Sequence, residues 1–446
     1  MKSVYIKTYG CQMNERDSED VAYKLKEKGY EIVSDEKIAD VVLLNTCSVR
    51  EQAELKAIGK AGHLLRSQNK NTRPIVGVMG CMAQNRGADL FDHLPDLDLV
   101  VGTQKFHRVP QYVDSLIDRV GDIPKRIVAI EDEEGSESEI KDHLDTEIDN
   151  PTAFVSIMQG CNMNCSFCIV PKTRGKERYR TIESIVEECR ELADRGIREV
   201  TLLGQIVNAY GRGSLRKINN KTPFVQLLES IDKIDGLERI RFTSPHPISF
   251  GEDLINCYKT IPSLCEYVHL PMQSGSDRIL KLMNRPYSRQ RYLEIAMKLR
   301  EVNPKMRLST DIIVGFPDET ENDFELTKSA FEEVNFEMAF IFKYSERKGT
   351  PAVSFNNHVP REVKEQRNQV LLSLLEKQSL KSNNLSIGKR FQILVESKAK
   401  RGVGKLMGRT RCNRKVIYDG ENCEIGQMFN VQISSATPTT LFGEKI

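Results

Sequence analysis

The start of the chain repeats one arrangement three times, a short apolar run that ends just before a cysteine. The runs and their cysteines are residues 4–9 with Cys11, residues 41–46 with Cys47, and residues 74–80 with Cys81. Helical patterns separate the runs, which predicts parallel strands joined by right-handed crossovers. Because the carboxyl ends of parallel strands meet at one edge of a sheet, we expect the three cysteines to converge there.

Three cysteines in the same position relative to three strands carry more information than one. A single cysteine in such a place is more often a small buried hydrophobic residue. Three of them together predict a site for an iron–sulfur cluster that is held by three thiolates.

A second group of three cysteines, Cys161, Cys165 and Cys168, lies on one short stretch with the spacing C-x3-C-x2-C. A closed zinc or iron–sulfur site uses four protein ligands, so three thiolates would hold a [4Fe–4S] cluster and leave its fourth iron open to a small molecule. The alternative is a zinc knuckle completed by a distant His or Cys. Zinc ribbons pair two C-x2-C elements, and the sequence has no second such element.

An acidic stretch divides the chain. Residues 131–150 hold ten acidic residues and one lysine, a composition typical of a solvated linker. We therefore expect an N-terminal α/β domain over residues 1–120, a linker over 121–150, a second domain over 151–380 and a third over 381–446.

The second domain alternates six strand-like runs with helical patterns, which predicts an open (β/α)6 barrel. Cys161, Cys165 and Cys168 follow the first run, at the carboxyl-terminal mouth where barrel active sites lie. The strand-like runs are residues 153–159, 199–204, 239–244, 267–272, 307–315 and 336–344. The helical patterns include residues 183–195, 224–234, 289–302, 321–334 and 361–385.

The third domain has alternating apolar runs at residues 391–396, 415–418 and 429–433, which predict a small all-β barrel. Residues 380–446 contain 12 Lys and Arg against 5 Asp and Glu, whereas the whole chain has a net charge of only +2. We expect this domain to contact RNA through one basic turn, although a merely solvated basic face is the alternative. The turn contains Arg409, Arg411, Asn413, Arg414 and Lys415.

Composition sets the remaining limits. The chain has 446 residues, 39% of them hydrophobic, which is enough for several packed cores. It has no run of about 18 apolar residues, so we expect no membrane span. Eleven cysteines without an export signal favour metal ligation in the reducing cytosol over disulfides.

Two motifs identify a family. Residues 9–14 read Tyr-Gly-Cys-Gln-Met-Asn, and residues 45–51 read Asn-Thr-Cys-Ser-Val-Arg-Glu. With the C-x3-C-x2-C loop, the chain resembles the radical S-adenosylmethionine (SAM) methylthiotransferases over nearly its whole length. The motifs are similar to the branch that converts N6-isopentenyladenosine at tRNA position 37 into its 2-methylthio derivative. The ribosomal-protein branch has Gly-Cys-Pro-Lys-Asn there, and the threonylcarbamoyladenosine branch has Gly-Cys-Lys-x-Asn.

Further segments match the same family, such as residues 171–175, 269–276 and 311–317. Two positions depart from its pattern. Tyr179 stands where a small residue is expected, and Ile206 stands where Asn is common. These departures bear on the detail of the pocket and leave the reaction class unchanged.

The resemblance implies a methylthiotransferase domain, a radical SAM core and a C-terminal TRAM domain with an OB-like barrel. It implies that Cys161, Cys165 and Cys168 bind the [4Fe–4S] cluster that reduces SAM to a 5′-deoxyadenosyl radical. It also implies a second [4Fe–4S] cluster, which holds the sulfur that a further SAM molecule methylates; its ligands are Cys11, Cys47 and Cys81.

The resemblance also implies partners and further site residues. We expect tRNA, through its anticodon stem-loop, an electron donor and a supplier of sulfur or clusters, and a monomeric cytoplasmic enzyme. The run Lys172, Arg174, Lys176, Arg178 and Arg180 is predicted to contact phosphate. Candidates for SAM binding are Gly204, Gln205, Ser244, His246, Gln273 and Gly315. The glycines could instead be ordinary turn residues and His246 a satisfied core histidine.

Three alternatives stay open. The first is methylthiolation of a threonylcarbamoyladenosine tRNA, and the second is methylthiolation of a ribosomal protein. The third is a non-catalytic RNA-binding protein that a metal stabilises.

Overall fold

The computed structural model describes residues 2–48, 51–66, 73–118, 126–131, 150–402, 404–420 and 423–446. The chain divides into two compact units. The first comprises Met1–Thr146, Met158–Met163 and Cys168–Arg180. The second comprises Glu147–Ile157, Asn164–Phe167 and Thr181–Ile446.

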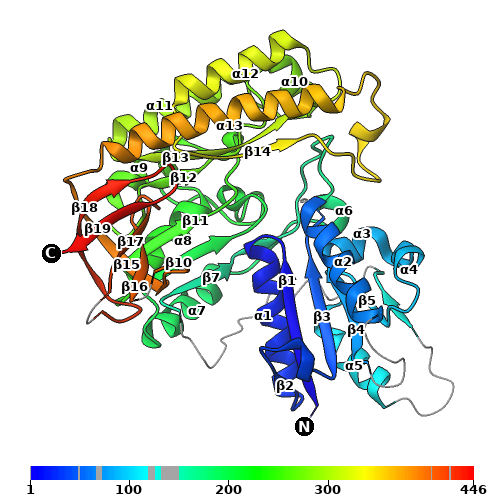
Figure 1. Cartoon of the computed structure of the whole chain (residues 1–446). Helices are drawn as coiled ribbons and strands as arrows, with labels where there is room; N and C mark the ends of the chain where they lie inside the picture. The colour runs from blue at the N-terminus through cyan, green and yellow to red at the C-terminus, as the bar shows by residue number, and fades with distance from the viewer. Residues whose placement is uncertain are drawn as a thin grey trace. The chain divides into compact units, whose positions relative to one another are not determined.

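The first unit contains a parallel sheet with the strand order β2-β1-β3-β4-β5-β6 (Figure 1). The three predicted strands are confirmed as β1, β3 and β4, and they lie side by side. Three short strands extend the sheet at its two edges. The strands are β1 (Ser3–Tyr9), β2 (Glu31–Ile32), β3 (Val41–Thr46), β4 (Ile75–Gly80), β5 (Leu99–Val101) and β6 (Ile127–Ala129).

Strand β3 shows why this sheet has helices on both faces. All six of its residues are buried, and the first four alternate between two cores. Val42 and Leu44 pack in one core with Ala57 and Ala61, while Val41 and Leu43 pack in the other. A strand that is apolar on both sides needs cover on both sides. The helices are α1 (Gln12–Glu27), α2 (Glu51–Arg66), α3 (Cys81–Arg86), α4 (Leu90–His93) and α5 (Val109–Ile117).

The segment expected to be a linker contains a strand, β6. Strand β6 pairs with β5, so the sheet continues inside the range 121–150. Most of the acidic stretch, residues 132–149, lies outside the described residues.

The second unit contains the predicted α/β barrel strands, arranged as two parallel sheets, β11-β10-β7 and β12-β13-β14. A parallel bridge between Ile240 and Leu264 links β11 to the segment that leads into β12. The six predicted strands are therefore confirmed. They are β7 (Thr152–Ser156), β10 (Glu199–Leu203), β11 (Arg239–Phe242), β12 (Tyr267–His269), β13 (Arg307–Val314) and β14 (Met338–Lys343).

Helices alternate with these strands as predicted, and two further helices were not expected, α9 and α10. Several begin at a Ser or Thr whose hydroxyl accepts a backbone N–H, for example Thr181, Ser288 and Thr320. The helices are α7 (Ile182–Asp194), α8 (Pro223–Ile231), α9 (Glu252–Thr260), α10 (Asp277–Leu282), α11 (Arg289–Val302), α12 (Glu321–Val334) and α13 (Arg361–Asn384).

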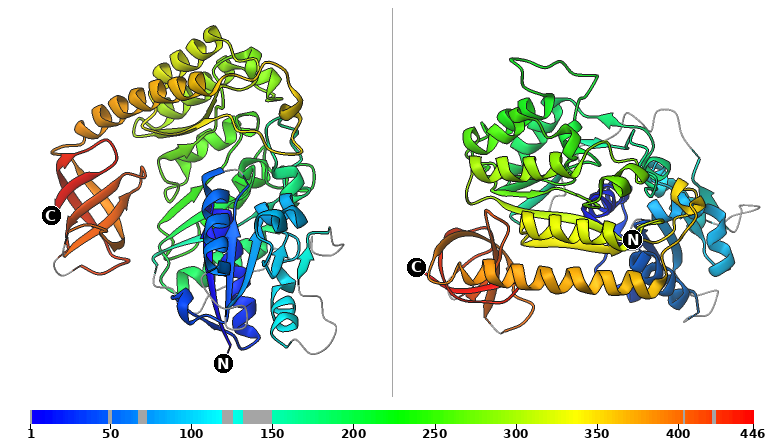
Figure 2. Two further views of the ribbon diagram at one scale, coloured as in Figure 1. Left: turned by 45° about the vertical axis from the view of Figure 1, so that its right-hand side comes forward. Right: turned by 90° about the horizontal axis from the view of Figure 1, so that it is seen from above.

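The predicted all-β domain is a closed barrel of order β15-β16-β17-β19-β18, and it follows the long helix α13 (Figure 2). Its interior is apolar and includes Ile393, Val416, Tyr418 and Val431. The strands are β15 (Arg390–Lys398), β16 (Lys405–Thr410), β17 (Lys415–Asp419), β18 (Met428–Ala436) and β19 (Leu441–Lys445).

The basic turn of this barrel packs against the α/β part of the same unit. Arg411 donates hydrogen bonds to the carboxylate of Glu266 and to the backbone oxygens of Pro262 and Leu264. In the opposite direction, Arg241 donates to the backbone oxygens of Thr410 and Arg411. The prediction that this turn faces phosphate is therefore wrong for Arg411, because its donors already have protein acceptors.

Candidate active site

The three N-terminal cysteines follow residues that are paired side by side in the sheet. Tyr9 is in register with Thr46, and Thr46 is in register with Gly80. Cys11, Cys47 and Cys81 come one or two residues after these positions. The predicted convergence at one sheet edge is thus confirmed. Two of the cysteines also stand at helix starts, Cys11 as the N-cap of α1 and Cys81 as the first residue of α3, where the helix dipole stabilises a thiolate.

Two glycines allow this close approach. A Cβ atom added to Gly10 would lie 2.4 Å from Asn14 Oδ1 and 3.0 Å from Cys47 Cβ. Gly80 has φ +96°, and a Cβ there would lie 2.3 Å from Asn45 Oδ1 and 2.8 Å from the backbone oxygen of Thr46. Both positions therefore exclude any side chain, since backbone or buried groups would have to move.

Buried asparagines fix the cysteine-bearing loops. Asn14 Oδ1 accepts a hydrogen bond from the backbone N–H of Cys11 at 3.4 Å. Asn45 Nδ2 donates to Ser18 Oγ at 2.9 Å, and both asparagines are fully buried. These contacts give a structural reason for the Asn that follows Cys11 in one motif and the Asn that precedes Cys47 in the other.

The electrostatic environment favours a thiolate at Cys11, whereas burial raises the pKa of Cys81 although Arg174 opposes that shift. A hydrogen bond with Cys47 lowers the pKa of Cys11 to about 6, although burial opposes the shift. Arg174, which is 4% exposed, points its Nε at Cys81 Sγ across 3.3 Å. Burial by itself lowers the pKa of Arg174, but the carboxylate of Asp17 outweighs that effect and raises the pKa, so the guanidinium is charged.

The C-x3-C-x2-C cysteines belong to both units. In the first unit, the Cys161 N–H donates to the backbone oxygen of Gly175 at 3.1 Å. In the second unit, Cys165 is 8% exposed and Arg285 Nη1 donates to its Sγ at 3.5 Å. The residue after Cys165, Ser166, is tied to the α10 segment through the backbone oxygens of Leu282 and Met283.

The predicted SAM residues lie at the carboxyl ends of four neighbouring barrel strands in the second unit. Two of them, Gln205 and His246, have a buried side-chain atom with no hydrogen-bond partner among the described residues, Gln205 Oε1 and His246 Nε2. Such orphaned atoms are expected where a polar ligand supplies the missing partner. The residues are Gly204 and Gln205 after β10, Ser244 and His246 after β11, Gln273 after β12, and Gly315 after β13.

His246 is held in one tautomer. Burial lowers its pKa to about 3, assisted by Arg285 and Arg212, so the ring is neutral at pH 7. Its Nδ1 accepts the backbone N–H of Ile248 at 3.2 Å. The ring proton therefore resides on Nε2, which is the buried atom without a partner, and His246 is not the satisfied core histidine considered above.

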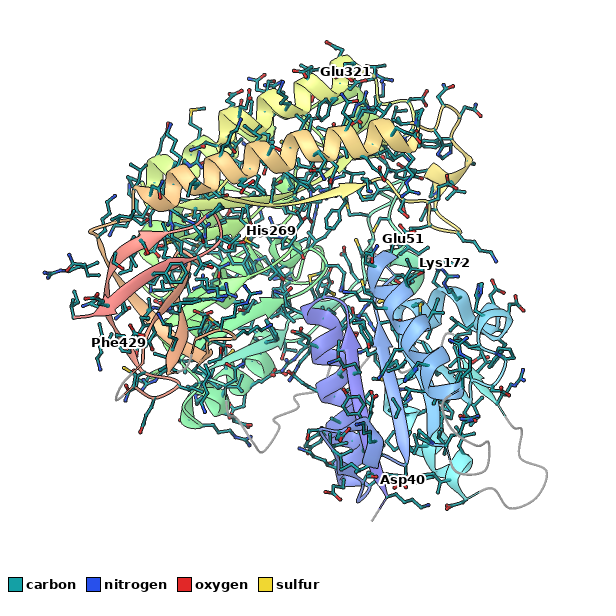
Figure 3. All side chains as sticks on the ribbon, viewed as in Figure 1. Asp40, Glu51, Lys172, His269, Glu321 and Phe429 are labelled. Atoms are coloured by element: carbon teal, nitrogen blue, oxygen red, sulfur yellow. The ribbon has the colours of Figure 1, made fainter. Side chains whose placement is uncertain are left out.

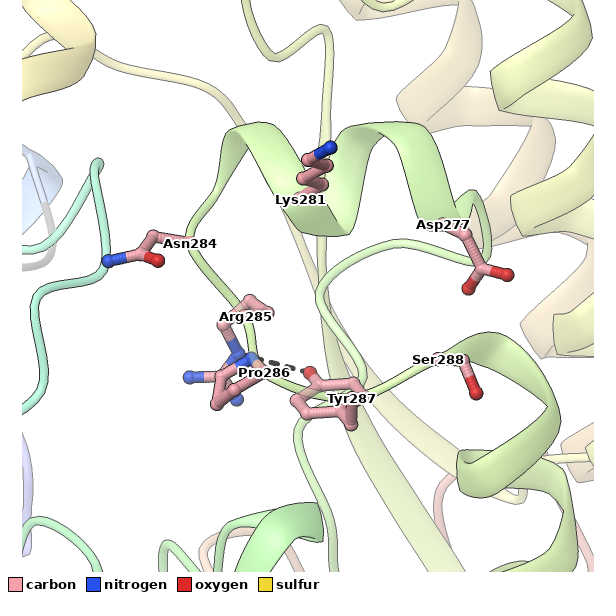
Figure 4. Close-up of a pocket in the computed structure, with 7 residues that line it drawn as sticks. All are labelled: Asp277, Lys281, Asn284, Arg285, Pro286, Tyr287 and Ser288. Carbon is pink, nitrogen blue, oxygen red and sulfur yellow. Dashed lines mark hydrogen bonds between the residues drawn. The ribbon is translucent and has the colours of Figure 1, made fainter.

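A pocket of about 420 Å³ lies next to these groups (Figure 4). Figure 4 shows Arg285 and Tyr287 hydrogen-bonded to each other, at 3.0 Å. Arg285 also reaches Cys165, and the ring of Tyr287 packs edge-on against His246 with 5.4 Å between centroids. The lining residues are Asp277, Lys281, Asn284, Arg285, Pro286, Tyr287 and Ser288.

Known proteins match the chain over its full length. Residues 3–102 match the family UPF0004, residues 155–330 the radical SAM superfamily, and residues 385–446 the TRAM domain. A protein of Opitutus terrae named tRNA-2-methylthio-N(6)-dimethylallyladenosine synthase is 53% identical, covering 100% of this chain and 97% of that protein. A protein of Akkermansia muciniphila with the same name is 47% identical, covering 99% of this chain and 98% of that protein.

The chain belongs to the tRNA-2-methylthio-N(6)-dimethylallyladenosine synthase family. It is a radical SAM methylthiotransferase, with [4Fe–4S] clusters and SAM as its cofactors. Among solved structures, the radical SAM methyltransferase TsrM from Kitasatospora setae matches with a TM-score of 0.58 and 15% identity. That match covers 79% of this chain and 77% of TsrM, and at this identity it shows a shared fold only.

The N-terminal cysteine site of this family member fits an iron–sulfur cluster. Two hydroxyls that flank Cys47, Thr46 Oγ1 and Ser48 Oγ, are buried without a partner among the described residues. Acceptor sulfurs would satisfy them. The described part of the chain has no group of three His, Cys, Asp or Glu side chains arranged to hold a single metal ion. A cubane cluster differs from such a site because each thiolate binds a different iron.

The basic run after Cys168 is only partly a surface for phosphate. Lys172 and Lys176 are exposed, but Arg174 and Arg180 are buried. Figure 3 shows Lys172 and Glu51 at the end of the first unit where the strands finish, with Asp40 at the other end. The predicted phosphate contact is therefore wrong for Arg174, whose guanidinium pairs with Asp17.

Sequence reasoning missed Asp17, Arg285 and Tyr287. Asp17 follows Cys11 by six residues on α1, and a charge in a helix is ordinarily taken as solvated. Arg285 and Tyr287 lie in the run Asn284-Arg285-Pro286-Tyr287 after α10, whose mixture of a cation, a proline and an aromatic residue was the one available signal.

The described part of the chain has no helix long and apolar enough to cross a membrane.

Proposed function

We propose that this chain attaches a methylthio group to carbon 2 of N6-isopentenyladenosine at position 37 of tRNA. The names of the relatives support this substrate. The observation that carries the proposal is the lateral register of the strand ends before Cys11, Cys47 and Cys81, because it provides a second cysteine site besides the C-x3-C-x2-C loop. A methyltransferase or a simple radical SAM enzyme has no need of such a site.

The reaction requires this cofactor set. Carbon 2 of adenine carries an unactivated C–H bond, which no side chain acting as a general base can open. When bound, the two clusters and SAM supply the radical that takes this hydrogen and the sulfur that replaces it. We assign the radical cluster to Cys161, Cys165 and Cys168, and the sulfur-bearing cluster to the other three cysteines. The protein supplies ligands, orientation and exclusion of water.

We assign SAM to the carboxyl ends of the second unit's strands. Gln205 Oε1 is an acceptor and His246 Nε2–H is a donor, and both are buried and unused among the described residues. Gly315 has φ +69°, and a Cβ there would lie 2.3 Å from Lys364 Cγ. Ser244 and Gln273 also have positive φ, +56° and +68°. The strained backbone at these positions is typical of a built ligand site.

The enzyme would bind the tRNA at its anticodon stem-loop, and the TRAM barrel would supply part of the contact surface. Exposed cations of this barrel take that role in place of Arg411, because phosphate contacts need accessible donors. They are Lys389, Arg390, Lys398, Lys400 and Arg401. We further propose a monomer in the cytoplasm that draws on a separate electron donor and a supplier of sulfur or clusters.

Two single substitutions test the separate roles proposed for the two cysteine groups. Cys165→Ala should abolish reductive cleavage of SAM, measured as 5′-deoxyadenosine. Cys47→Ala should retain cleavage and stop formation of 2-methylthio nucleoside, measured by mass spectrometry of tRNA digests. Full product from the Cys47→Ala variant would disprove the role of the N-terminal site.

The substrate is tested with tRNAs that bear or lack the isopentenyl group. Turnover is expected only with the isopentenylated tRNA. Equal turnover on both would disprove the assignment, and activity on threonylcarbamoyladenosine tRNA or on a ribosomal protein would support the other branches. Reconstitution with iron and sulfide should give about eight irons per chain, whereas zinc binding without SAM cleavage would favour a non-catalytic protein.

A further inference from the structure

Arg174 occupies a position that the radical SAM reaction does not explain. It is the last residue of α6 (Val170–Arg174), six residues after Cys168, and it is buried where its neighbours Lys172 and Lys176 are exposed. Its Nη1 and Nη2 donate to the two carboxylate oxygens of Asp17, at 3.0 and 2.6 Å. Its third nitrogen, Nε, donates its single N–H to Cys81 Sγ at 3.3 Å.

The pair with Asp17 fixes the direction of that third donor. Asp17 lies on α1, the helix that Cys11 caps, and its side chain is 3% exposed. Two parallel N–H···O bonds lock the plane of the guanidinium. The direction of the Nε–H bond is thereby fixed, and it points at the sulfur of Cys81. A lysine ammonium carries its three N–H donors on one nitrogen, so it cannot reproduce the two parallel bonds to Asp17 together with a donor at a separate atom that faces Cys81.

The same short segment also contacts the second group of cysteines. Gly175, the residue after Arg174, accepts the backbone N–H of Cys161 at 3.1 Å. Its conformation has φ +72°, which favours glycine. Thr103 Oγ1 donates to the backbone oxygen of Thr173, which anchors α6 to the N-terminal sheet. The chain that carries Cys161 and Cys168 is thus attached to Cys81 through one side chain.

We propose that Arg174, oriented by Asp17, is a positioning residue that sets the reduction potential of the N-terminal cluster and holds Cys81 in place as its ligand. A cation that donates a hydrogen bond to a cysteine sulfur stabilises the more negative, reduced form of a cluster, so the potential rises. This inference rests on the proposed assignment of a cluster to Cys11, Cys47 and Cys81.

The test isolates the N-terminal cluster. In a parent with Cys161, Cys165 and Cys168 all replaced by Ala, about four irons per chain should remain after reconstitution. The midpoint potential is then measured by a redox titration followed by electron paramagnetic resonance. Arg174→Lys should shift it to more negative values by at least the equivalent of a tenfold change in the reduced-to-oxidised ratio, about 59 mV for one electron.

Two further variants complete the design. Asp17→Asn keeps the guanidinium but weakens its orientation, so the potential should shift in the same direction. Arg73→Lys is the matched control. Arg73 pairs with the buried Asp98 at 2.6 Å at the start of β4, whereas Cys81 follows the end of that strand. This control should leave the potential and the iron content unchanged.

The outcomes distinguish a failure of the cluster assignment from a failure of the role proposed for Arg174. A parent that binds no iron would overturn the assignment of a cluster to these cysteines, and the inference with it. A parent with four irons whose potential is unchanged by Arg174→Lys and Asp17→Asn would overturn the inference alone. If both variants lose iron but keep the circular dichroism of the parent, while Arg73→Lys keeps its cluster, the role in holding Cys81 is supported.

Discussion

Asn45 Nδ2 donates a hydrogen bond to the backbone oxygen of Asn14 at 2.8 Å, and Asn14 Nδ2 donates in return to Asn45 Oδ1 at 3.2 Å. These two hydrogen bonds between Asn14 and Asn45 join the loop that carries Cys11 to the loop that carries Cys47. Two residues that are distant in sequence thereby set the spacing of two cluster ligands.

Replacing Asn45 by Ala should damage both the domain and the cluster. The change removes the donor to the backbone oxygen of Asn14 and the nearer acceptor of Asn14 Nδ2, and it leaves Ser18 Oγ with Thr8 alone. Buried polar groups that lose a partner in this way cost about 1–3 kcal/mol each. We expect a lower unfolding midpoint and iron content falling from about eight toward about four per chain. The control is Asn303→Ala. Among the described residues, its half-buried side chain accepts a local turn bond from the backbone N–H of Lys305 and makes no other side-chain hydrogen bond. Full iron in the Asn45 variant would contradict this.

Replacing Gly80 by Ala tests the close approach of the loops. Gly29 provides the matched control, because it has a similar φ of +84° and nothing within 4 Å of an added Cβ. Gly29→Ala should cost only the backbone strain, about 1–2 kcal/mol. Gly80→Ala should cost about 1–3 kcal/mol more, since the Cβ collides with Asn45 and Thr46. Denaturant unfolding measures both, and equal losses would argue against the collision.

The pH dependence of stability should contain a contribution from Glu319. Burial raises its pKa to about 7, although the Gly315 N–H and Arg367 both oppose the shift. Because the folded state holds this proton more tightly than the unfolded state, stability from this group falls as pH rises from about 4.5 to 7, by up to about 1.4 kcal/mol per pH unit. Glu319→Gln should flatten that slope in urea unfolding at pH 5.5 and 7.5. An unchanged slope would mean that Glu319 does not titrate there.

Replacing Arg411 by Ala should weaken the packing of the TRAM barrel on the α/β part of the second unit. The affinity for tRNA should change by no more than the loss of one positive charge predicts. The substitution leaves Glu266 without its guanidinium partner and removes the donors to two backbone oxygens. We expect a lower thermal midpoint and faster proteolysis after α13. If the slope of log K against log salt for tRNA binding fell strongly while the thermal midpoint stayed unchanged, Arg411 would be a phosphate contact after all.

Replacing Lys398, Lys400 and Arg401 together by Ala should give the opposite result. These side chains are exposed at the end of β15 and in the turn that follows. The slope of log K against log salt for tRNA should fall by about one for each phosphate contact removed, with the thermal midpoint unchanged. An unchanged slope would exclude this surface from the tRNA interface.

Much of this architecture follows from local pattern. The apolar runs before Cys11, Cys47 and Cys81 and the six runs of the barrel became strands, because periodicity and burial act over a few residues. The convergence of the three cysteines also followed, since parallel strands have only one carboxyl edge. Short elements such as β2, β6 and α10 were not predicted, because their stability comes from neighbours rather than from their own sequence.

What the sequence alone determined is the chemistry available: which cysteines exist, how they are spaced, and that three parallel strands bring them together. The tertiary structure alone decided which charges are free. Arg174 and Arg411 are basic residues in basic runs, yet each is committed to partners far along the chain, Asp17 with Cys81 in one case and Glu266 in the other. Pattern cannot distinguish such residues from solvated ones, because the cost of burying a charge is offset only by partners that the fold assembles.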